Sequence, residues 1–235
     1  AEEALRDGHG LDLSVASTLH RGLSAAELVE HALKRGEGIL ASSGALVADT
    51  GQFTGRSPKD KYVVVNSARE GVDWGSVNQP VEQGRFDRLL ADMSAHAAGM
   101  ELYVQDLAIG ADPAHQASVR IVTEYAWHSL FASNIFRRQA VPTDSPEWLV
   151  LDLPSFEADP ARHGCRSTTA IMLDFERRLA LVANTEYAGE IKKGVFTALN
   201  LVLPQRGVLP MHCSANETVA GDVALFFGLS GTGKT

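Results

Sequence analysis

Apolar residues along the chain recur at two spacings, one typical of helices and one typical of strands. Ser24-Ala25-Ala26-Glu27 has the serine and glutamate of a capping box, and the apolar positions after it keep helical spacing until Gly36. Runs rich in β-branched residues predict strands. Helices are predicted between Ser24 and Gly36 and over residues 81–98, 125–136 and 189–203, the last ended by Pro204. Strands are predicted at residues 39–41, 45–48, 61–65, 101–109, 118–123, 148–153, 168–174, 179–183 and 223–227, with 168–174 and 179–183 forming a hairpin.

This order of elements predicts an α/β protein with two parts. Residues 1–207 are predicted to form a mixed α/β amino-terminal domain. Gly207 and Pro210 mark a boundary, after which residues 208–235 are predicted to supply the first strands and the phosphate-binding loop of a mononucleotide-binding domain.

A glycine-rich loop closes the chain and gives its clearest chemical signal. It matches the pattern G-x-x-x-x-G-K-[ST] and follows an apolar run, 223–227, that predicts a buried strand. The loop consists of Gly228, Leu229, Ser230, Gly231, Thr232, Gly233, Lys234 and Thr235. Its N–H groups would cradle phosphates, Lys234 would reach the β and γ phosphates, and Thr235 would bind Mg²⁺. The alternative is a chance glycine-rich turn. Because the helix expected next would need further residues, we expect this chain to be the front part of a longer protein.

Composition and charge narrow the class of partner. The chain has 235 residues, of which 45% are apolar and 21% charged, enough for a substantial core, and its net charge is −8. An acidic balance argues against general nucleic-acid binding but allows a local basic pocket for anions. Two cysteines without a C-x-x-C pattern, no apolar run of about 18 residues and no signal-peptide core predict a cytoplasmic protein without a membrane partner.

Two basic segments are candidates for an anion site. Residues 50–62 form a polar loop with Arg56, whose planar fork suits a carboxylate or phosphate, although a solvated turn is the simpler interpretation of the spacing. Lys192 and Lys193 lie near a predicted helix start, where the helix dipole disfavours cations. A bound anion would resolve that conflict, and a solvated basic face is the alternative.

His212 is the remaining candidate ligand. It follows a short apolar stretch, lies in a predicted strand and precedes the glycine-rich loop. Imidazole commonly binds divalent transition metals, although a lone histidine is more often a core or surface residue. The other histidines have no metal-ligand spacing, and the chain contains neither H-E-x-x-H nor G-x-S-x-G.

Four segments in this order resemble the ATP-dependent phosphoenolpyruvate carboxykinases. They read TGRSPKDK at 54–61, YAGEIKKG at 187–194, MHCSAN at 211–216 and FGLSGTGKT at 227–235. The resemblance extends from about Gly51 to Thr235. It implies conversion of oxaloacetate and ATP to phosphoenolpyruvate, ADP and CO₂ in gluconeogenesis, with small molecules as the only partners besides the rest of the same protein.

The resemblance also implies roles for single residues. Arg56 corresponds to the arginine that holds the substrate carboxylate, and Tyr187 to the tyrosine beside substrate and CO₂. Lys193 and His212 correspond to ligands of a Mn²⁺ ion that bridges the γ-phosphate and the substrate, and Lys192 would neutralise charge beside them. The loop 228–235 would hold the ATP phosphates, with Thr235 on Mg²⁺. Lys193 could ligate a metal only as a neutral amine, which requires a strongly lowered pKa.

Chains of this family continue further and add a pair of metal-binding aspartates, an adenine pocket and another substrate arginine. We therefore expect no turnover from these 235 residues alone. Two alternatives stay open. Another P-loop phosphotransferase would need neither Arg56 nor the Lys193–His212 pair, and a non-catalytic nucleotide-binding module would bind ATP without forming product.

Overall fold

A mixed β-sheet forms the centre of the first of two units into which the chain divides, Ala1–Ala198 and Leu199–Thr235. The computed structural model describes residues 9–138 and 145–228. Within these residues the sheet has nine strands in the order β1-β6-β7-β9-β11-β10-β4-β5, with β8 beside β6. The strands are β1 Thr18–Arg21, β4 Lys61–Val64, β5 Gln79–Val81, β6 Glu101–Ile109, β7 Ala117–Thr123, β8 Arg137–Arg138, β9 Trp148–Leu153, β10 Ala170–Asp174 and β11 Leu179–Ala183. The predicted α/β class is confirmed.

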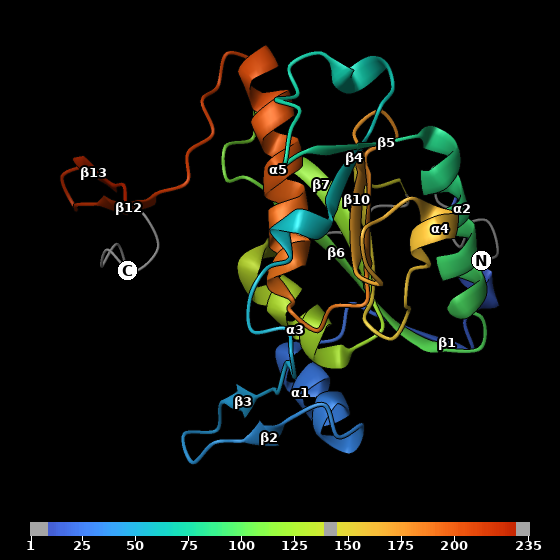
Figure 1. The fold of residues 1–235 in the computed structure, drawn as a ribbon. Helices are drawn as coiled ribbons and strands as arrows, with labels where there is room; N and C mark the ends of the chain where they lie inside the picture. Colours follow the sequence, from blue (N-terminus) through green and yellow to red (C-terminus); the bar gives the residue numbers. More distant parts are fainter. Residues whose placement is uncertain (1–8, 139–144, 229–235) are drawn as a thin grey trace. The chain divides into compact units, whose positions relative to one another are not determined.

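Both faces of this sheet carry helices, which explains why its central strands are apolar on both sides. The helices are α1 Ala25–Lys34, α2 Gln83–His96, α3 Ala126–Ile135, α4 Pro160–His163 and α5 Gly189–Gln205. In Figure 1, α2 and α4 cover one face, whereas α3 and the part of α5 in the first unit cover the other. Every residue of β9 and β11 is buried. The predicted hairpin is confirmed by the antiparallel pairing of β10 with β11.

Helix α1 begins and ends as its sequence predicts. The Ser24 hydroxyl accepts from the Glu27 N–H, and the Glu27 carboxylate accepts from the Ser24 N–H at 2.7 Å, so the capping box is confirmed. Gly36 adopts a φ of +70°, which lets the Glu37 N–H reach the carbonyl of Ala32 and close the helix.

In the first unit, one helix begins later than predicted, and four short elements were not predicted. The helix predicted from residue 81 begins at Gln83, because Val81 belongs to the edge strand β5, where Pro80 is tolerated. The short elements β1, β5, β8 and α4 were not predicted, since each is too brief to show a periodic pattern.

Helix α5 crosses the unit boundary and continues beyond its predicted end. Pro204 lies inside the last turn and the helix ends at Gln205, so the prediction that Pro204 stops it at residue 203 is wrong. A proline at this position removes only one N–H donor from the helix. The helix is ended by Gly207, which has a φ of +73° and lets the Val208 N–H donate to the carbonyl of Leu203.

The second unit contains the end of α5 and a hairpin of β12, Ser214–Glu217, and β13, Val223–Phe226. The prediction of a buried strand at 223–227 is wrong about burial: Val223 is 63% and Phe227 62% exposed. A two-stranded ribbon offers no second layer to cover its apolar face among the described residues of this unit. The predicted division after residue 207 stays a prediction.

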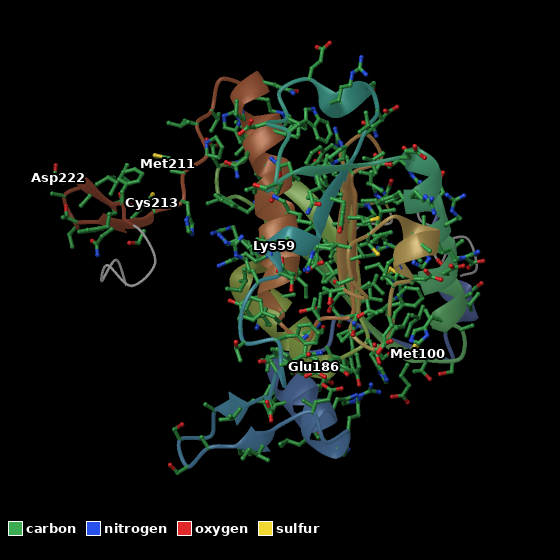
Figure 2. All side chains as sticks on the ribbon, viewed as in Figure 1. Lys59, Met100, Glu186, Met211, Cys213 and Asp222 are labelled. Carbon is green, nitrogen blue, oxygen red and sulfur yellow. The ribbon has the colours of Figure 1, made fainter. Side chains whose placement is uncertain are left out.

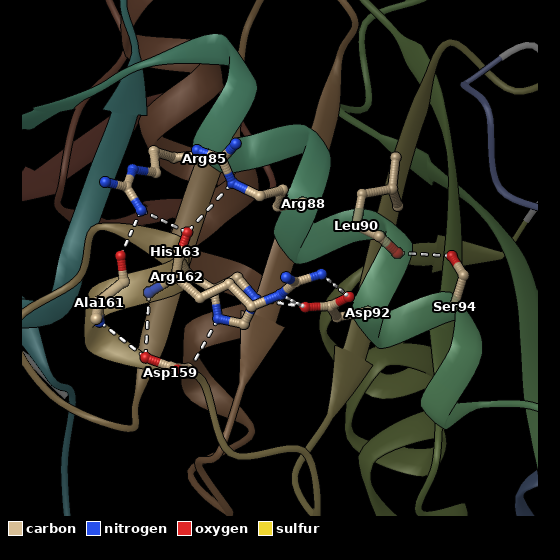
Figure 3. A network of polar contacts seen from close by, with 9 residues as sticks. All are labelled: Arg85, Arg88, Leu90, Asp92, Ser94, Asp159, Ala161, Arg162 and His163. Carbon is tan, nitrogen blue, oxygen red and sulfur yellow. Dashed lines mark hydrogen bonds and ion pairs between the residues drawn. The ribbon is translucent and has the colours of Figure 1, made fainter.

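A network of polar contacts joins α2 to α4 on one face of the sheet (Figure 3). Asp92 of α2 accepts from the guanidinium of Arg162 and, at 2.9 Å, from Nε2 of His163, which is buried. Nδ1 of His163 accepts from the N–H of Asp159, the residue that caps α4. The Arg162 guanidinium lowers the pKa of Asp92 to about 2, with a smaller contribution from His163.

Replacement of Asp92 by asparagine is expected to destabilise the protein in a pH-dependent way. A carboxyl whose folded pKa is lowered stabilises the protein above its unfolded pKa, and this contribution is lost as the pH falls from about 4 to about 2. We expect D92N to lower the free energy of unfolding at pH 7 by about 1 kcal/mol, because the pair is partly exposed. Urea unfolding of D92N and the parent should converge near pH 2, and Asp73→Asn, at an exposed position, is the control. A difference that stays constant down to pH 2 would contradict this assignment.

The structure contains no helix, among the residues it describes, that is long and apolar enough to cross a membrane.

Candidate active site

A pocket of about 300 Å³ in the first unit brings together four of the predicted site residues, Arg56, Tyr187, Lys192 and Lys193. Arg56 comes from the loop before β4, Tyr187 from the turn that enters α5, and both lysines from the start of this helix. Two aromatic side chains of α3 complete the wall. The full lining is Thr50, Arg56, Trp127, Phe131, Tyr187, Ala188, Gly189, Lys192 and Lys193. In Figure 2, Lys59 marks the loop segment beside α5 and Glu186 marks the turn that leads into this helix.

Two buried carboxylates fix the segment that directly follows Arg56 in its loop. The Ser57 N–H donates to Oε1 of Glu190 at 2.7 Å, and Glu190 is only 4% exposed. Three residues further along, the buried Asp60 accepts two hydrogen bonds from the guanidinium of Arg166, at 2.9 and 2.8 Å. The segment that follows Arg56 is therefore held in place by side chains.

The charged side chains around Arg56 shift one another's pKa values. Burial raises the pKa of Glu190 against the Ser57 hydrogen bond and the nearby cations, which lower it. Burial also lowers the pKa of Lys61, and the positive charge of Arg56 lowers it further. One buried carboxylate thus faces several cations, so the pocket keeps a surplus of positive charge in a chain whose net charge is negative.

Tyr187 is placed by the turn between β11 and α5. Asn184 opens the turn with a φ of +51°, and the Tyr187 N–H donates to Oγ1 of Thr185 at 3.2 Å. The first residue of α5 is Gly189, and a Cβ atom there would lie 2.4 Å from Cε1 of Tyr187. The tyrosine ring therefore lies directly against the glycine backbone, a position that no other residue type at 189 would permit.

Lys193 shows the direction of pKa shift that a metal-ligating lysine needs. Burial lowers its pKa, and the charges of Arg56 and Lys192 lower it further, against an opposing effect of Glu190. A lowered pKa increases the fraction of neutral amine, the form with a free lone pair. Its Nζ lies 5.0 Å from the centroid of the Phe196 ring. The role of Lys193 as a ligand stays a prediction.

The remaining predicted residues lie elsewhere in the chain. His212 belongs to the second unit and lies before β12, so its placement in a strand was wrong. The antiparallel register pairs Ser214 with Phe226, so it would set His212 opposite Gly228, where β13 has already ended. Gly228 lies two residues after the end of that strand, and residues 229–235 lie outside the described residues.

The described residues contain some of the ligand types that a transition metal prefers. The described ranges, 9–138 and 145–228, contain no cluster of three or more His, Cys, Asp or Glu side chains that could hold a metal ion. The candidate donors there are the amine of Lys193 and the imidazole of His212, and nitrogen ligands of this kind suit divalent transition metals.

Several residues of the site were missed by sequence reasoning. Trp127 and Phe131 line the pocket from α3, and their spacing of four residues places them on one helix face. Glu190 lies three residues before Lys193 on α5, so helical periodicity in that segment could have identified it.

A larger pocket, of about 850 Å³, also has Trp127 in its lining and contains none of the predicted residues. Its charged lining is mostly acidic, with Glu37, Asp49 and Glu186 against Arg35. Arg35 is engaged by Glu37 at 2.6 Å. The smaller pocket is therefore the better site for an anionic ligand.

Comparison with known proteins shows the family of the chain. A model of the phosphoenolpyruvate carboxykinase family matches residues 17–235. The chain is 57% identical over 216 residues to "Phosphoenolpyruvate carboxykinase (ATP)" of Methylobacterium nodulans, covering 91% of this chain and 40% of the relative. It is 52% identical over 233 residues to the protein of the same name from Rhodopseudomonas palustris strain BisB5, covering 97% and 43%. A third relative, from Rhizobium meliloti, is 53% identical over 228 residues, covering 96% and 42%. The chain spans about two fifths of the length of these curated relatives.

Proposed function

This chain belongs to the phosphoenolpyruvate carboxykinase family, and on that premise we propose that it forms the substrate side of an enzyme that converts oxaloacetate and ATP to phosphoenolpyruvate, ADP and CO₂. The activity is proposed for the complete protein, because the chain spans only 40% to 43% of the length of the relatives compared above. The observation that carries the proposal is the gathering of Arg56, Lys192 and Lys193 with Tyr187 in one pocket.

The pocket chemistry suits a dicarboxylic acid that loses CO₂. Decarboxylation of oxaloacetate leaves an enolate, and cations fixed beforehand around the developing charge lower the barrier. Arg56 would grip a substrate carboxylate through its planar fork, and its rigid loop would keep that geometry through the reaction. Lys192 would balance the charge that builds up beside it.

The aromatic side of the pocket would orient the substrate and limit water. Trp127 and Phe131 form this wall, and the Tyr187 ring lies against Gly189, the first residue of α5. An enolate protonated by water would be lost as pyruvate, so exclusion of water favours phosphoryl transfer. The Tyr187 hydroxyl would hydrogen-bond to the substrate or to CO₂.

Metal and nucleotide sites would complete the enzyme. Lys193 and His212 would hold Mn²⁺, the loop 228–235 would hold the phosphates of ATP, and Thr235 would contact Mg²⁺. When bound, the divalent ions supply charge stabilisation to the enolate and to the transferring phosphoryl group. We also propose a cytoplasmic setting, which the free thiols of Cys165 and Cys213 support.

The test is an assay of phosphoenolpyruvate formation by the full-length protein with oxaloacetate, ATP and Mn²⁺. We expect turnover that Arg56→Ala lowers by about 10²- to 10³-fold in kcat/KM, because a group that stabilises charge in the transition state is lost. Arg69→Ala, at an exposed position on another segment, is the matched control and should behave like the parent.

Other outcomes identify the other two classes of protein. ATP-dependent phosphorylation of a different acceptor that is insensitive to Arg56→Ala would favour another P-loop phosphotransferase. ATP binding without product would favour a nucleotide-binding module.

A further inference from the structure

His128 is a fully buried histidine of α3 that contacts two acceptors on two other segments. Its Nδ1 lies 2.5 Å from Oδ2 of Asp152, a buried residue of β9. Its Nε2 lies 3.0 Å from the carbonyl oxygen of Glu186. The ring therefore links the centre of the sheet to the turn that carries Tyr187.

The two partners determine the protonation state of the ring. A carboxylate and a carbonyl oxygen both accept hydrogen bonds, so both ring nitrogens must donate, which only the imidazolium can do. Burial by itself would favour the neutral ring. The Asp152 carboxylate, the Glu186 carbonyl and the Glu37 charge act together against this effect, so the pKa of His128 is raised overall.

We propose that His128 is a positioning residue for Tyr187: its imidazolium, fixed by Asp152, clamps the Glu186 carbonyl and thereby sets the turn that places Tyr187 in the pocket. The proposal rests on the proposed function only for the identity of the ligand, because the clamp itself follows from contacts within the first unit.

The clamp acts on Tyr187 through one peptide plane. The Glu186 carbonyl and the Tyr187 N–H belong to the same peptide group, which is planar, so fixing the carbonyl fixes the direction of that N–H. The same N–H donates to Thr185 Oγ1, and the Tyr187 carbonyl accepts from the Glu190 N–H at 3.1 Å. Of these contacts, only the one to His128 joins the turn to α3.

His128 also supports the aromatic wall of the pocket. Its ring meets the neighbouring Trp127 ring edge to face, with centroids 4.2 Å apart. If the ring lost its Nε2 proton, a lone pair would face the Glu186 oxygen, and repulsion would replace attraction. One side chain thus couples Trp127 and Tyr187, which both line the same pocket.

The test compares variants of His128 with a matched control in the full-length protein. His128→Phe keeps a ring but removes both donors, and His128→Gln keeps one amide donor and is the milder change if the phenylalanine variant fails to fold. His163→Phe is the control, because His163 is also buried and bonded to a carboxylate but lies in the network of α2 and α4. Melting temperature verifies folding, hydrogen exchange follows the amides of residues 185–188, and kinetics give kcat and KM for oxaloacetate.

We expect His128→Phe to speed exchange at residues 185–188 by more than about tenfold and to lower kcat/KM by about 10- to 100-fold. His128→Gln should show smaller changes in both exchange and kcat/KM. His163→Phe should lower the melting temperature but leave exchange at residues 185–188 and kcat/KM unchanged. Equal exchange and kcat/KM in the His128 and His163 variants would overturn the proposal. A parent protein that forms no phosphoenolpyruvate would instead reject the proposed function, and the exchange rates would still decide the role of His128.

Discussion

Replacing Lys193 with glutamine is expected to weaken Mn²⁺ binding by at least about 100-fold and to lower kcat by about 1,000-fold in the full-length protein. The reason is the state of the amine. Burial, Arg56 and Lys192 lower the pKa of Lys193, so the lone pair that a metal requires is available at a smaller cost than on an exposed lysine. Glutamine keeps a polar side chain of similar reach but has no amine. Titration of Mn²⁺ followed by electron paramagnetic resonance measures the affinity without any need for turnover.

A variant of the neighbouring Lys192 distinguishes a bond to the metal from a general effect of charge in the pocket. Lys192→Gln makes the same side-chain change at a neighbouring position of the same pocket, so we expect it to lower kcat while leaving Mn²⁺ affinity within a few fold of the parent. Unchanged Mn²⁺ affinity in Lys193→Gln would eliminate its ligand role. Equal weakening in both variants would assign the effect to pocket charge rather than to a bond with the metal.

Local sequence signals predicted most of the secondary structure, because they depend on contacts within a few residues. The capping box at Ser24 and the terminating Gly36 are confirmed. The long strand β6 and the hairpin of β10 and β11 are also where the apolar runs predict them. Local patterns of this kind contain no information about strand order. In the sheet, β4 lies beside β10, although more than a hundred residues separate them in the sequence.

Burial was the property that sequence predicted least well, because it depends on what packs against an element. The apolar run at 223–227 forms a strand but has only β12 beside it, and its side chains remain exposed. His212 was placed in a strand from its apolar neighbours, yet pairing ends at Ser214, because the partner strand stops at Phe226. In both cases the local pattern identified the apolar residues but gave no information about the segment that pairs with them.

Assembly of the candidate site required the fold as well as the motifs. Spacing alone favoured a solvated turn for the loop of Arg56, and only the resemblance grouped this residue with Lys192 and Lys193. The structure brings all three to one pocket. The pair of His128 and Asp152 gave no signal, since a buried charge pair between a helix and a strand leaves no pattern in the sequence.

The site therefore depends on two kinds of support. Buried carboxylates hold the parts of the chain that carry charge: Glu190 and Asp60 fix the loop of Arg56, and Asp152 fixes the histidine that reaches the turn of Tyr187. The second kind is steric, because Tyr187 can occupy its position only while residue 189 lacks a side chain. The steric support can be tested with a single methyl group.

Replacing Gly189 with alanine is expected to lower kcat/KM for oxaloacetate by about 100-fold, the effect of moving a positioning group by roughly 1 Å. The new Cβ would lie 2.4 Å from Cε1 and 3.0 Å from Cζ of Tyr187, so the ring must leave its place. The backbone at residue 189 does not require a positive φ, so the expected loss comes from the ring and not from strain in the main chain.

Gly194→Ala is the matched control on the same helix. Its Cβ would meet Leu173 and Ala180 at 3.6 and 3.8 Å, which are ordinary packing distances, and alanine favours helix over glycine by up to about 1 kcal/mol. We therefore expect Gly194→Ala to keep the kcat/KM of the parent and to melt at the same or a higher temperature. If Gly189→Ala matched it in kcat/KM, the position of the Tyr187 ring against the helix would have no part in catalysis. A loss confined to Gly189→Ala, in a protein that melts like the parent, would assign the effect to that ring.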